Sequence, residues 1–245
     1  MSFELNTMNR TEDSVAATFA DPSVGGRQIE FASGATVFEQ GADAGHLYFI
    51  QRGQVRLYQE GPDGSGRLLE ILGAGQWFGC SALSETRQFH AKAVAFGRTV
   101  LMQTPVENVL EVVRRSPEAA VQLITQLADN VQAAREDSAR LVFDDCNERL
   151  IKTLVRFSRT AAATPHDDGV VLHITHEQLA QAVGVARETV SLALTEMRLN
   201  HLVRTGRNQL TFNPAALQQF ASRSNKINGN AKAAPREEQP AEVAA

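Results

Sequence analysis

The sequence of 245 residues contains few cysteines and no long apolar segment. Its two cysteines, Cys80 and Cys146, are 66 residues apart. Two cysteines cannot supply the four thiolates of an iron–sulfur cluster, and their spacing fits neither a zinc ribbon nor a disulfide framework. No apolar run reaches the roughly 18 residues that a membrane-spanning helix needs, so the sequence predicts no membrane span.

The chain also lacks the short motifs of common enzyme classes. It has no His/Cys/Asp spacing typical of a metal site, no phosphate loop of the GxxxxGK type and no nucleophile elbow. We therefore predict neither catalytic residues nor metal ligands. The first ten residues, MSFELNTMNR, have neither the basic nor the apolar region of a signal peptide, so we expect a cytoplasmic protein.

The charges are divided unevenly along the chain, although the net charge is only −4. Residues 1–148 carry 12 Lys/Arg and 20 Asp/Glu, whereas residues 149–223 carry 9 Lys/Arg and 5 Asp/Glu. The second region therefore has a net charge of +4. A basic region behind an acidic one favours a protein whose C-terminal part meets a polyanion such as nucleic acid.

Composition and periodicity divide the chain into five regions. Residues 1–27 lack periodicity and are expected to be flexible, and residues 224–245 lack an apolar face and are expected to be disordered. Residues 28–116 contain short segments rich in β-forming residues between glycine turns, which is typical of an all-β sandwich or barrel. Residues 117–145 predict a long helix and a hinge, and residues 146–223 predict a compact helical unit with a hairpin.

The long helix carries apolar residues at alternating spacings of three and four. This heptad pattern predicts pairing with a second helix over about three heptads. The alternative is an amphipathic helix that packs only on its own domain. The predicted seam consists of Val121, Ile124, Ala128, Val131, Arg135, Ser138 and Val142, of which Arg135 and Ser138 are polar.

The C-terminal unit shows the order helix, glycine turn, helix and hairpin. Thr175 is expected to cap the helix HEQLAQAV together with Gln178, three residues further on. Gly184 permits the sharp turn before the helix ARETVSLALTEMRLN. LVRTGRNQLTF then predicts a hairpin with Gly206 at its tip. Together these elements predict a winged helix-turn-helix.

The start of the second helix carries residues suited to contacts with DNA bases. Arg187 offers a bidentate fork to guanine, Glu188 accepts from cytosine, and Ser191 can bond to either. Other residues are expected to contact backbone phosphates, which position the domain without specifying a sequence. They are Thr175, His176, Thr189, Arg204 and Arg207. The alternatives are a solvated pair at Arg187 and Glu188, or a winged helix that binds proteins.

The segment ITHEQLAQAVGVARETVSLAL resembles the helix-turn-helix signature of the CRP/FNR superfamily of bacterial transcription regulators. The order of regions is similar too, with GAGQWFG in the β-rich region and LVFDDCNERLIKTLVRFSR as the hinge and the next helix. The resemblance covers about residues 28–222. It implies an α+β fold with an N-terminal double-stranded β-helix (a jelly-roll of the cyclic-nucleotide-binding type), a long dimerisation helix and a C-terminal winged helix-turn-helix.

The same resemblance implies a homodimer that binds an inverted-repeat operator in double-stranded DNA. RNA polymerase is implied as a further partner if the protein is an activator. Asp145 matches the family's hinge aspartate, and Phe143 is assigned to the same hinge. The alternative function of another class is a sensor module that acts through protein partners.

The resemblance also places the residues of the second helix. Arg187 and Glu188 match the family's two main base-contacting positions, and Ser191 matches a third that the FNR branch uses. Leu192 stands where both the cyclic-AMP branch and the FNR branch carry a second arginine. This replacement removes ~1–3 kcal/mol of discrimination at one base pair, although a leucine can contact a thymine methyl group. We therefore expect a half-site that differs from the family consensus at one position.

The loop GQWFGCSALSETRQFHAK resembles the one that holds the ligand in the cyclic-AMP branch. That branch uses a Gly–Glu, an Arg–Ser and a Thr–Ser pair. The matching positions here are Gly79–Cys80, His90–Ala91 and Ala134–Arg135, so only the glycine is kept. Because the charged and hydroxyl partners of the nucleotide are missing, we expect affinity for cyclic AMP to be lost.

Four hypotheses about the occupant of this pocket stay open. In the first hypothesis, the pocket binds another small anion through Arg87 and Arg135. The segment FGCSALSETRQFHAKAVAF is similar to the corresponding segment of the 2-oxoglutarate-responsive branch, which implies such a ligand. In the second, the pocket holds haem on His90 or Cys80 and senses a gas. Cys80 itself senses redox state, or the pocket has no ligand. The predicted pocket consists of Gly79, Cys80, Ser81, Arg87, His90, Ala91, Ala134 and Arg135.

Overall fold

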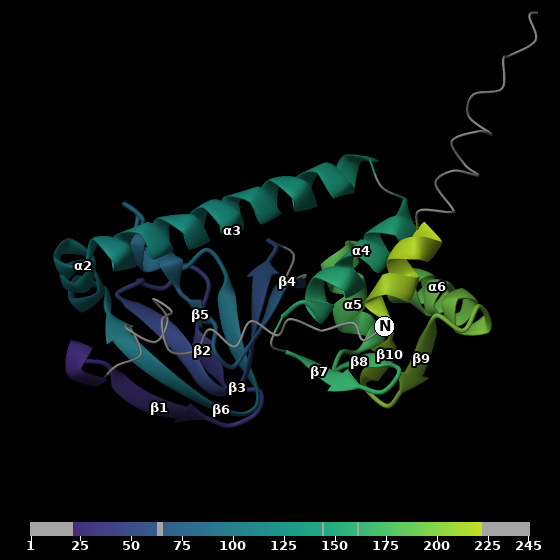
Figure 1. Ribbon diagram of the computed structural model, residues 1–245, viewed down its shortest axis with the longest axis horizontal. Coiled ribbons are helices and arrows are strands. Elements are labelled where there is room, and N and C mark those ends of the chain that lie inside the picture. Colours follow the sequence, from purple (N-terminus) through teal and green to yellow (C-terminus); the bar gives the residue numbers. More distant parts are fainter. Residues whose placement is uncertain (1–21, 63–65, 144, 161, 222–245) are drawn as a thin grey trace, which may run out of the picture.

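The computed structural model describes residues 22–62, 66–143, 145–160 and 162–221. Its described residues form an N-terminal β-roll and a C-terminal winged domain, and one long helix runs from the first to the second (Figure 1). This arrangement confirms the predicted α+β fold.

The β-roll is a six-stranded antiparallel sheet. Its strands are β1 (Arg27–Phe31), β2 (Thr36–Phe38), β3 (His46–Glu60), β4 (Gly66–Gly73), β5 (Trp77–Phe78) and β6 (Lys92–Pro105). The order is β1-β6-β3-β4, with β2 paired to β6 and β5 paired to β3. Apolar residues of the long strands, such as Leu47, Val55 and Leu101, are buried in the roll's own core.

Strand β3 differs from the predicted pattern of short β-rich segments between glycine turns, which divides it at Gly53 into HLYFIQ and QVRLYQ. Both segments belong to this one strand of 15 residues, whose pairing with β6 shifts register around Arg52. Gly53 lies at the shift with φ 89°, and a Cβ added to it would stand 2.6 Å from the carbonyl oxygen of Arg98. Gly53 therefore forms a bulge within the strand and not a turn between strands.

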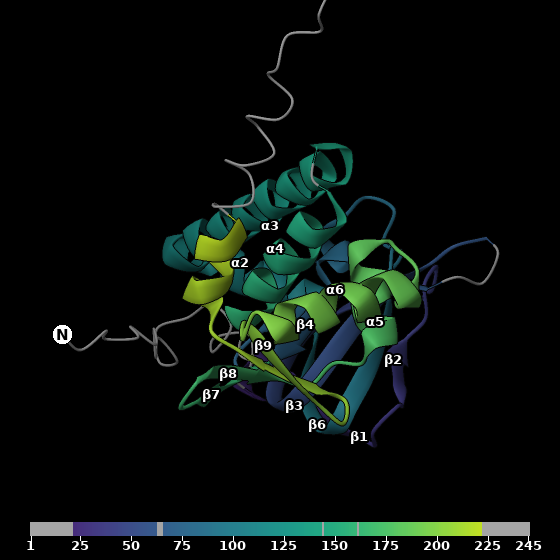
Figure 2. The same ribbon diagram turned by 90° about the vertical axis from the view of Figure 1, so that its right-hand side faces the viewer.

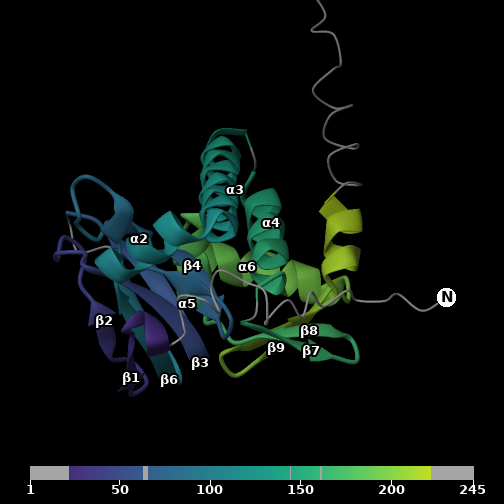
Figure 3. The ribbon, with the colours of Figure 1, turned by 60° about the vertical axis from the view of Figure 1, so that its left-hand side comes forward.

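Helix α2 (Val106–Arg115) leads into α3 (Pro117–Phe143), which lies along the roll and extends towards the winged domain (Figure 3). The inner face of α3 buries Ala119 and Leu123 in the core of the roll. The indole Nε1 of Trp77 donates a 2.5 Å hydrogen bond to Oε1 of Gln126 on the same helix. In the described part of the chain, no helix is both long and apolar enough to cross a membrane.

The winged domain follows the predicted order and adds a strand. It contains α4 (Cys146–Ser158), β7 (Ala163–His166), β8 (Gly169–Leu172), α5 (His176–Val183), α6 (Arg187–Leu199), β9 (Val203–Gly206) and β10 (Gln209–Phe212), and residues 214–221 are helical. The strand order is β7-β8-β10-β9. The segment TPHDDG, at residues 164–169, has the proline and glycine typical of the end of a helix. In the structure, its first three residues belong to β7, an edge strand that tolerates Pro165.

The winged domain packs directly against the roll of its own chain (Figure 2). Leu68 and Ile71 of β4 are each 1% exposed and belong to one hydrophobic core with residues of α4, α5 and α6. Hydrogen bonds cross the same boundary, among them those from Gln54 to the Ala162 carbonyl (3.2 Å), from Gln178 to the Tyr58 hydroxyl (3.1 Å) and from Arg156 to the Leu69 carbonyl (3.2 Å). The sequence indicated the two domains but gave no sign of this contact between them.

Candidate DNA interface and effector pocket

The turn between α5 and α6 is built by local interactions. The Thr175 hydroxyl accepts from the backbone N–H of Gln178, and the Gln178 side chain accepts from the backbone N–H of Thr175, both at 3.1 Å. This confirms the predicted capping box. Gly184 ends α5 at φ 75° and donates to the carbonyl of Ala180 at 2.8 Å. The chain then turns within three residues and starts α6 at Arg187.

Helix α6 has one buried and one exposed face. Its buried residues are Val190, Ala193, Leu194 and Met197. Arg187, Glu188 and Thr189 are all exposed in the first turn. An apolar face of this kind holds the helix on the domain and leaves the charged first turn pointing outward. The two predicted base-contacting charges are therefore accessible.

Ser191 and His176 lie in contact with each other. Nδ1 of His176 is 3.0 Å from Oγ of Ser191, and both residues are half-buried. From the sequence, Ser191 was expected to contact a base and His176 a phosphate, and their pairing was not predicted. Leu192 is 74% exposed and stands one helical turn after Glu188, on the same face of α6.

Three of the predicted phosphate contacts, Thr175, His176 and Arg207, line a hollow of about 450 Å³ beside the start of α6, whereas Thr189 and Arg204 lie outside it. Its lining includes Thr175, His176, Arg187, Arg207 and Asn208, from α5, α6 and the wing hairpin. The Arg204 guanidinium forms a 2.6 Å ion pair with Asp168, whereas Arg207 is exposed near the tip of the wing. Residues of three separate elements therefore converge on one concave surface.

Gly79 in the predicted effector loop has a packing role that does not depend on a ligand. It has φ 91°, and an added Cβ would stand 3.0 Å from the His46 carbonyl oxygen and 3.2 Å from Cδ2 of Tyr48. The rings of Tyr48 and Phe78 stack beside it, with centroids 5.2 Å apart. Only glycine fits this close approach to β3 without displacing neighbours.

The other predicted pocket residues on the roll are mostly at its surface. Cys80 begins the short 3₁₀ helix η2 (Cys80–Leu83) and keeps an exposed edge. The protein atoms around its sulfur nevertheless desolvate the thiolate and raise the pKa of the thiol, and the charge of Glu70 adds to this shift. Arg87 forms a 3.1 Å ion pair with Glu107 of α2. His90 is exposed, and Ser81 and Ala91 are half-buried.

The described residues of the predicted seam lie on the outer side of α3, away from the roll. Val121, Ile124 and Val131 are 63%, 65% and 52% exposed. Ala128, Ala134 and Arg135 are exposed as well. The side chains of Ser138, Val142 and Phe143 lie outside the described residues. An exposed stripe of large apolar side chains on one long helix is typical of a surface that pairs with another chain.

Asp145, assigned to the hinge, caps the N-terminus of α4. Its Oδ1 accepts a 2.8 Å hydrogen bond from the backbone N–H of Glu148. An aspartate at this position satisfies one of the N–H groups that the first helical turn leaves without a partner. Asp145 therefore sets where the first helix of the winged domain begins.

Two family models match the described regions. Residues 28–116 match the cyclic nucleotide-binding domain, and residues 148–220 match the Crp-like helix-turn-helix domain. The first match covers the roll with α2, and the second covers most of the winged domain. The long helix α3 lies between the two matched regions.

Curated relatives align over most of the chain. The cyclic AMP receptor protein of Thermus thermophilus is 31% identical over 187 residues, which cover 76% of this chain and 84% of that protein. The cAMP-activated global transcriptional regulator CRP of Haemophilus influenzae is 27% identical over 175 residues, which cover 71% of this chain and 78% of the relative.

Solved structures show the same fold. A transcriptional regulator of the CRP/FNR family from Thermus thermophilus superposes with a TM-score of 0.65 at 25% identity, over 80% of this chain and 98% of that one. The c-di-GMP-responsive global regulator CLP of Xanthomonas campestris superposes with a TM-score of 0.67 at 21% identity, over 80% and 99% of the two chains.

Proposed function

The chain belongs to the CRP/FNR superfamily of transcription regulators, and we propose that it acts as a homodimer on an inverted-repeat operator and answers to an effector other than cyclic AMP. Its helix-turn-helix is a DNA-binding domain of the Crp-like type. The observation that carries the proposal is the exposed first turn of α6, where Arg187 and Glu188 stand beside the basic wing.

The base-contacting set of this proposal is Arg187, Glu188 and Leu192. The two charged residues offer the hydrogen-bond patterns that distinguish guanine and cytosine in the major groove. Leu192 shares their exposed face and offers an apolar surface to a thymine methyl group. Because the Ser191 hydroxyl is within hydrogen-bond distance of His176, we assign Ser191 to orienting that histidine towards the phosphate backbone.

The proposed dimer forms through the outer stripe of α3. Val121, Ile124 and Val131 expose more than half of their surface to solvent, and pairing with a second α3 would bury them. A two-fold dimer places its two α6 helices in successive major grooves, about 34 Å apart, which matches an inverted repeat. RNA polymerase is the expected further partner if the protein activates transcription, and the cytoplasm is the expected location.

The effector of this proposal differs from that of the named cyclic AMP receptors. Of the positions matched to the ligand pairs of the cyclic-AMP branch, Gly79 alone is kept, and its contacts with β3 explain it without a ligand. Cys80 and His90 supply neither the acceptor nor the permanent charge that the nucleotide requires. The Arg87 charge is already balanced by Glu107. An effector would regulate DNA binding only through different affinities for two arrangements of the domains.

Footprinting on genomic fragments tests the proposal. We expect protection of an inverted repeat, and Arg187→Ala should weaken binding to it about ten- to hundredfold, since one bidentate base contact is worth ~1–3 kcal/mol. Arg114→Ala, which removes an exposed arginine from α2, is the matched control and should bind as the wild type does. The absence of a protected repeat, or full affinity of Arg187→Ala, would contradict the proposal. Weak, sequence-independent binding would instead favour a sensor that acts through protein partners.

A further inference from the structure

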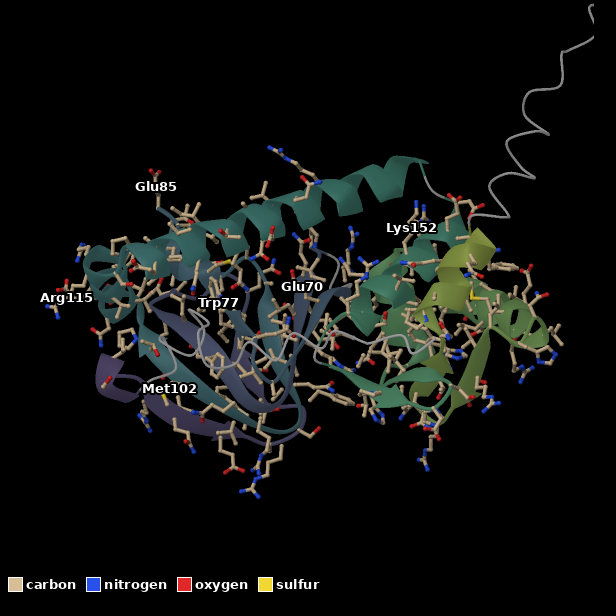
Figure 4. All side chains as sticks on the ribbon, in the orientation of Figure 1. Glu70, Trp77, Glu85, Met102, Arg115 and Lys152 are labelled. Carbon is tan, nitrogen blue, oxygen red and sulfur yellow. The ribbon has the colours of Figure 1, made fainter. Side chains whose placement is uncertain are left out.

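The exposed face of α6 carries apolar groups beyond its charged first turn. Leu192 is 74% exposed and Leu199 is 73% exposed, and the two lie seven residues apart on the same side of the helix. Thr195 lies between them, three residues after Leu192, and is exposed as well. In Figure 4, the side chains of α6 project from the side of the winged domain that lies farthest from the roll. This face is therefore open to a partner.

The hydroxyl group of Thr195 is engaged by its own helix. Its Oγ1 donates a 2.8 Å hydrogen bond to the backbone carbonyl oxygen of Ser191, one helical turn earlier. A threonine in a helix has two main rotamers, and this hydrogen bond selects one of them. Because the hydroxyl proton is bound within the helix, the methyl group is the main surface that Thr195 offers to a partner.

Glu188, Leu192 and Thr195 follow one another along the exposed face of α6. Residues three or four positions apart are neighbours on a helix surface. Three residues rise ~4.5 Å along a helix, which is close to the roughly 3.4 Å between successive bases of one DNA strand. Two neighbouring apolar groups on α6 therefore match two neighbouring bases. The apolar group that a base edge presents in the major groove is the C5-methyl group of thymine.

We propose that Leu192 and Thr195 contact the C5-methyl groups of two adjacent pyrimidines on one strand of each half-site, Leu192 the first and Thr195 the second. Thr195 is then a specificity-determining residue in addition to the base-contacting set. This inference rests on the proposed function, because it requires the first turn of α6 to lie in the major groove. The recognised chemistry is the methyl group, so thymine and 5-methylcytosine both supply it, whereas uracil and cytosine do not.

The apolar contact is expected to end at Thr195. Glu196 is exposed one residue later, and its carboxylate is repelled by the phosphate backbone. Leu199 stands ~10 Å along the helix axis from Leu192, a distance of about three base steps. A recognition helix contacts base edges with its N-terminal residues, so Leu199 lies outside the contact. It therefore offers a matched control, an exposed leucine on the same face.

Gel-shift titration of the full chain tests the proposal, on operators with one altered base in one half-site. At each position of the footprinted repeat, dT is compared with dU, and dC with 5-methyl-dC. We expect two adjacent positions at which loss of the methyl group weakens wild-type binding about fourfold, as for burial of one methyl group. Leu192→Ala should lose this dependence at the first position alone. Thr195→Ser removes a methyl group, keeps the hydroxyl and should lose the dependence at the second position alone.

Two control variants make the outcome decisive. Thr195→Val keeps a methyl group in place of the hydroxyl, and Leu199→Ala changes only the distant leucine, so both should keep the dependence at both positions. The proposal is overturned if only one position responds in the wild type, if Thr195→Ser keeps the second dependence, or if either control variant loses it. Failure of the proposed function would appear separately, as the absence of a protected repeat or as full affinity of Arg187→Ala.

Discussion

The guanidinium of Arg56 on β3 donates a 2.5 Å hydrogen bond to the backbone carbonyl oxygen of His173. Arg56 is 2% exposed and lies 3.6 Å from the ring centroid of Phe96, and this burial lowers the pKa of its guanidinium. His173 lies between β8 and the capping box of α5. The roll therefore holds the chain directly before the helix-turn-helix.

Replacing Arg56 should destabilise the whole chain. Arg56→Ala leaves the His173 carbonyl without this donor and creates a cavity, so we expect the free energy of unfolding to fall by about 2–4 kcal/mol. Urea unfolding followed by circular dichroism measures the change. Arg52→Ala, an exposed arginine on the same strand, should change the stability by less than about 0.5 kcal/mol. Equal losses in the two variants would argue against the contact.

The proposed role of Leu192 predicts a dependence on a single methyl group of the operator. Replacing the contacted dT by dU should weaken wild-type binding about fourfold, since burial of one methyl group is worth ~0.8 kcal/mol. Leu192→Ala should bind both operators equally, whereas Ser191→Ala should keep the preference for dT. Gel-shift titrations of each half-site position measure these ratios. Equal sensitivity to dU in the wild type and in Leu192→Ala would exclude the contact.

The outer stripe of α3 predicts which substitutions separate the proposed dimer. Ile124→Asp places a charge in the apolar seam, and we expect it to convert the dimer into a monomer. Gln122→Asp changes an exposed residue on another face of the same helix and should leave the dimer intact. Size-exclusion chromatography with light scattering distinguishes the two states. A dimeric Ile124→Asp would place the interface elsewhere.

Gly79 and Gly75 form a matched pair in the effector loop. Both have positive φ, 91° and 86°, but only Gly79 has atoms within 4 Å of an added Cβ. Gly75→Ala should therefore lower the free energy of unfolding by about 1–2 kcal/mol, because alanine disfavours a positive φ. Gly79→Ala should lower it by about 2–4 kcal/mol, because its Cβ also crowds β3. Thermal unfolding of the two variants measures the difference. If Gly79→Ala costs no more than Gly75→Ala, the close approach to β3 is not what requires glycine.

Alkylation of Cys80 tests the hypothesis of thiol sensing. Desolvation raises the pKa of this thiol, so less thiolate is present at neutral pH than in an ordinary cysteine, and reaction with iodoacetamide should be slower. In a Cys146→Ser background, the rate for the folded protein should keep rising at a pH where the urea-unfolded protein has already levelled off. A faster reaction in the folded protein, with its inflection at lower pH, would favour thiol sensing instead.

The helix-turn-helix was predictable because local interactions build it. Thr175 and Gln178 cap α5 from three residues apart, and Gly184 supplies the positive φ that ends it. The long helix was predictable from its 3-and-4 spacing and its lack of internal glycine and proline. These features depend only on residues within a few positions of one another. Strand β7 is also built locally, because Asp167 and Asp168 form the tight turn between β7 and β8. It was nevertheless missed, because Pro165 within it is unusual for a strand.

By itself, the sequence of this protein determined its elements, its charged first turn on α6 and its resemblance to a family, because periodicity and capping act over short distances along the chain. Only the tertiary structure decided which partners distant residues have. His176 meets Ser191, Arg87 pairs with Glu107, and Arg56 reaches a carbonyl group 117 residues away. The first two contacts form when each domain folds, and the third forms when the roll and the winged domain pack together. No local pattern encodes how such distant surfaces fit.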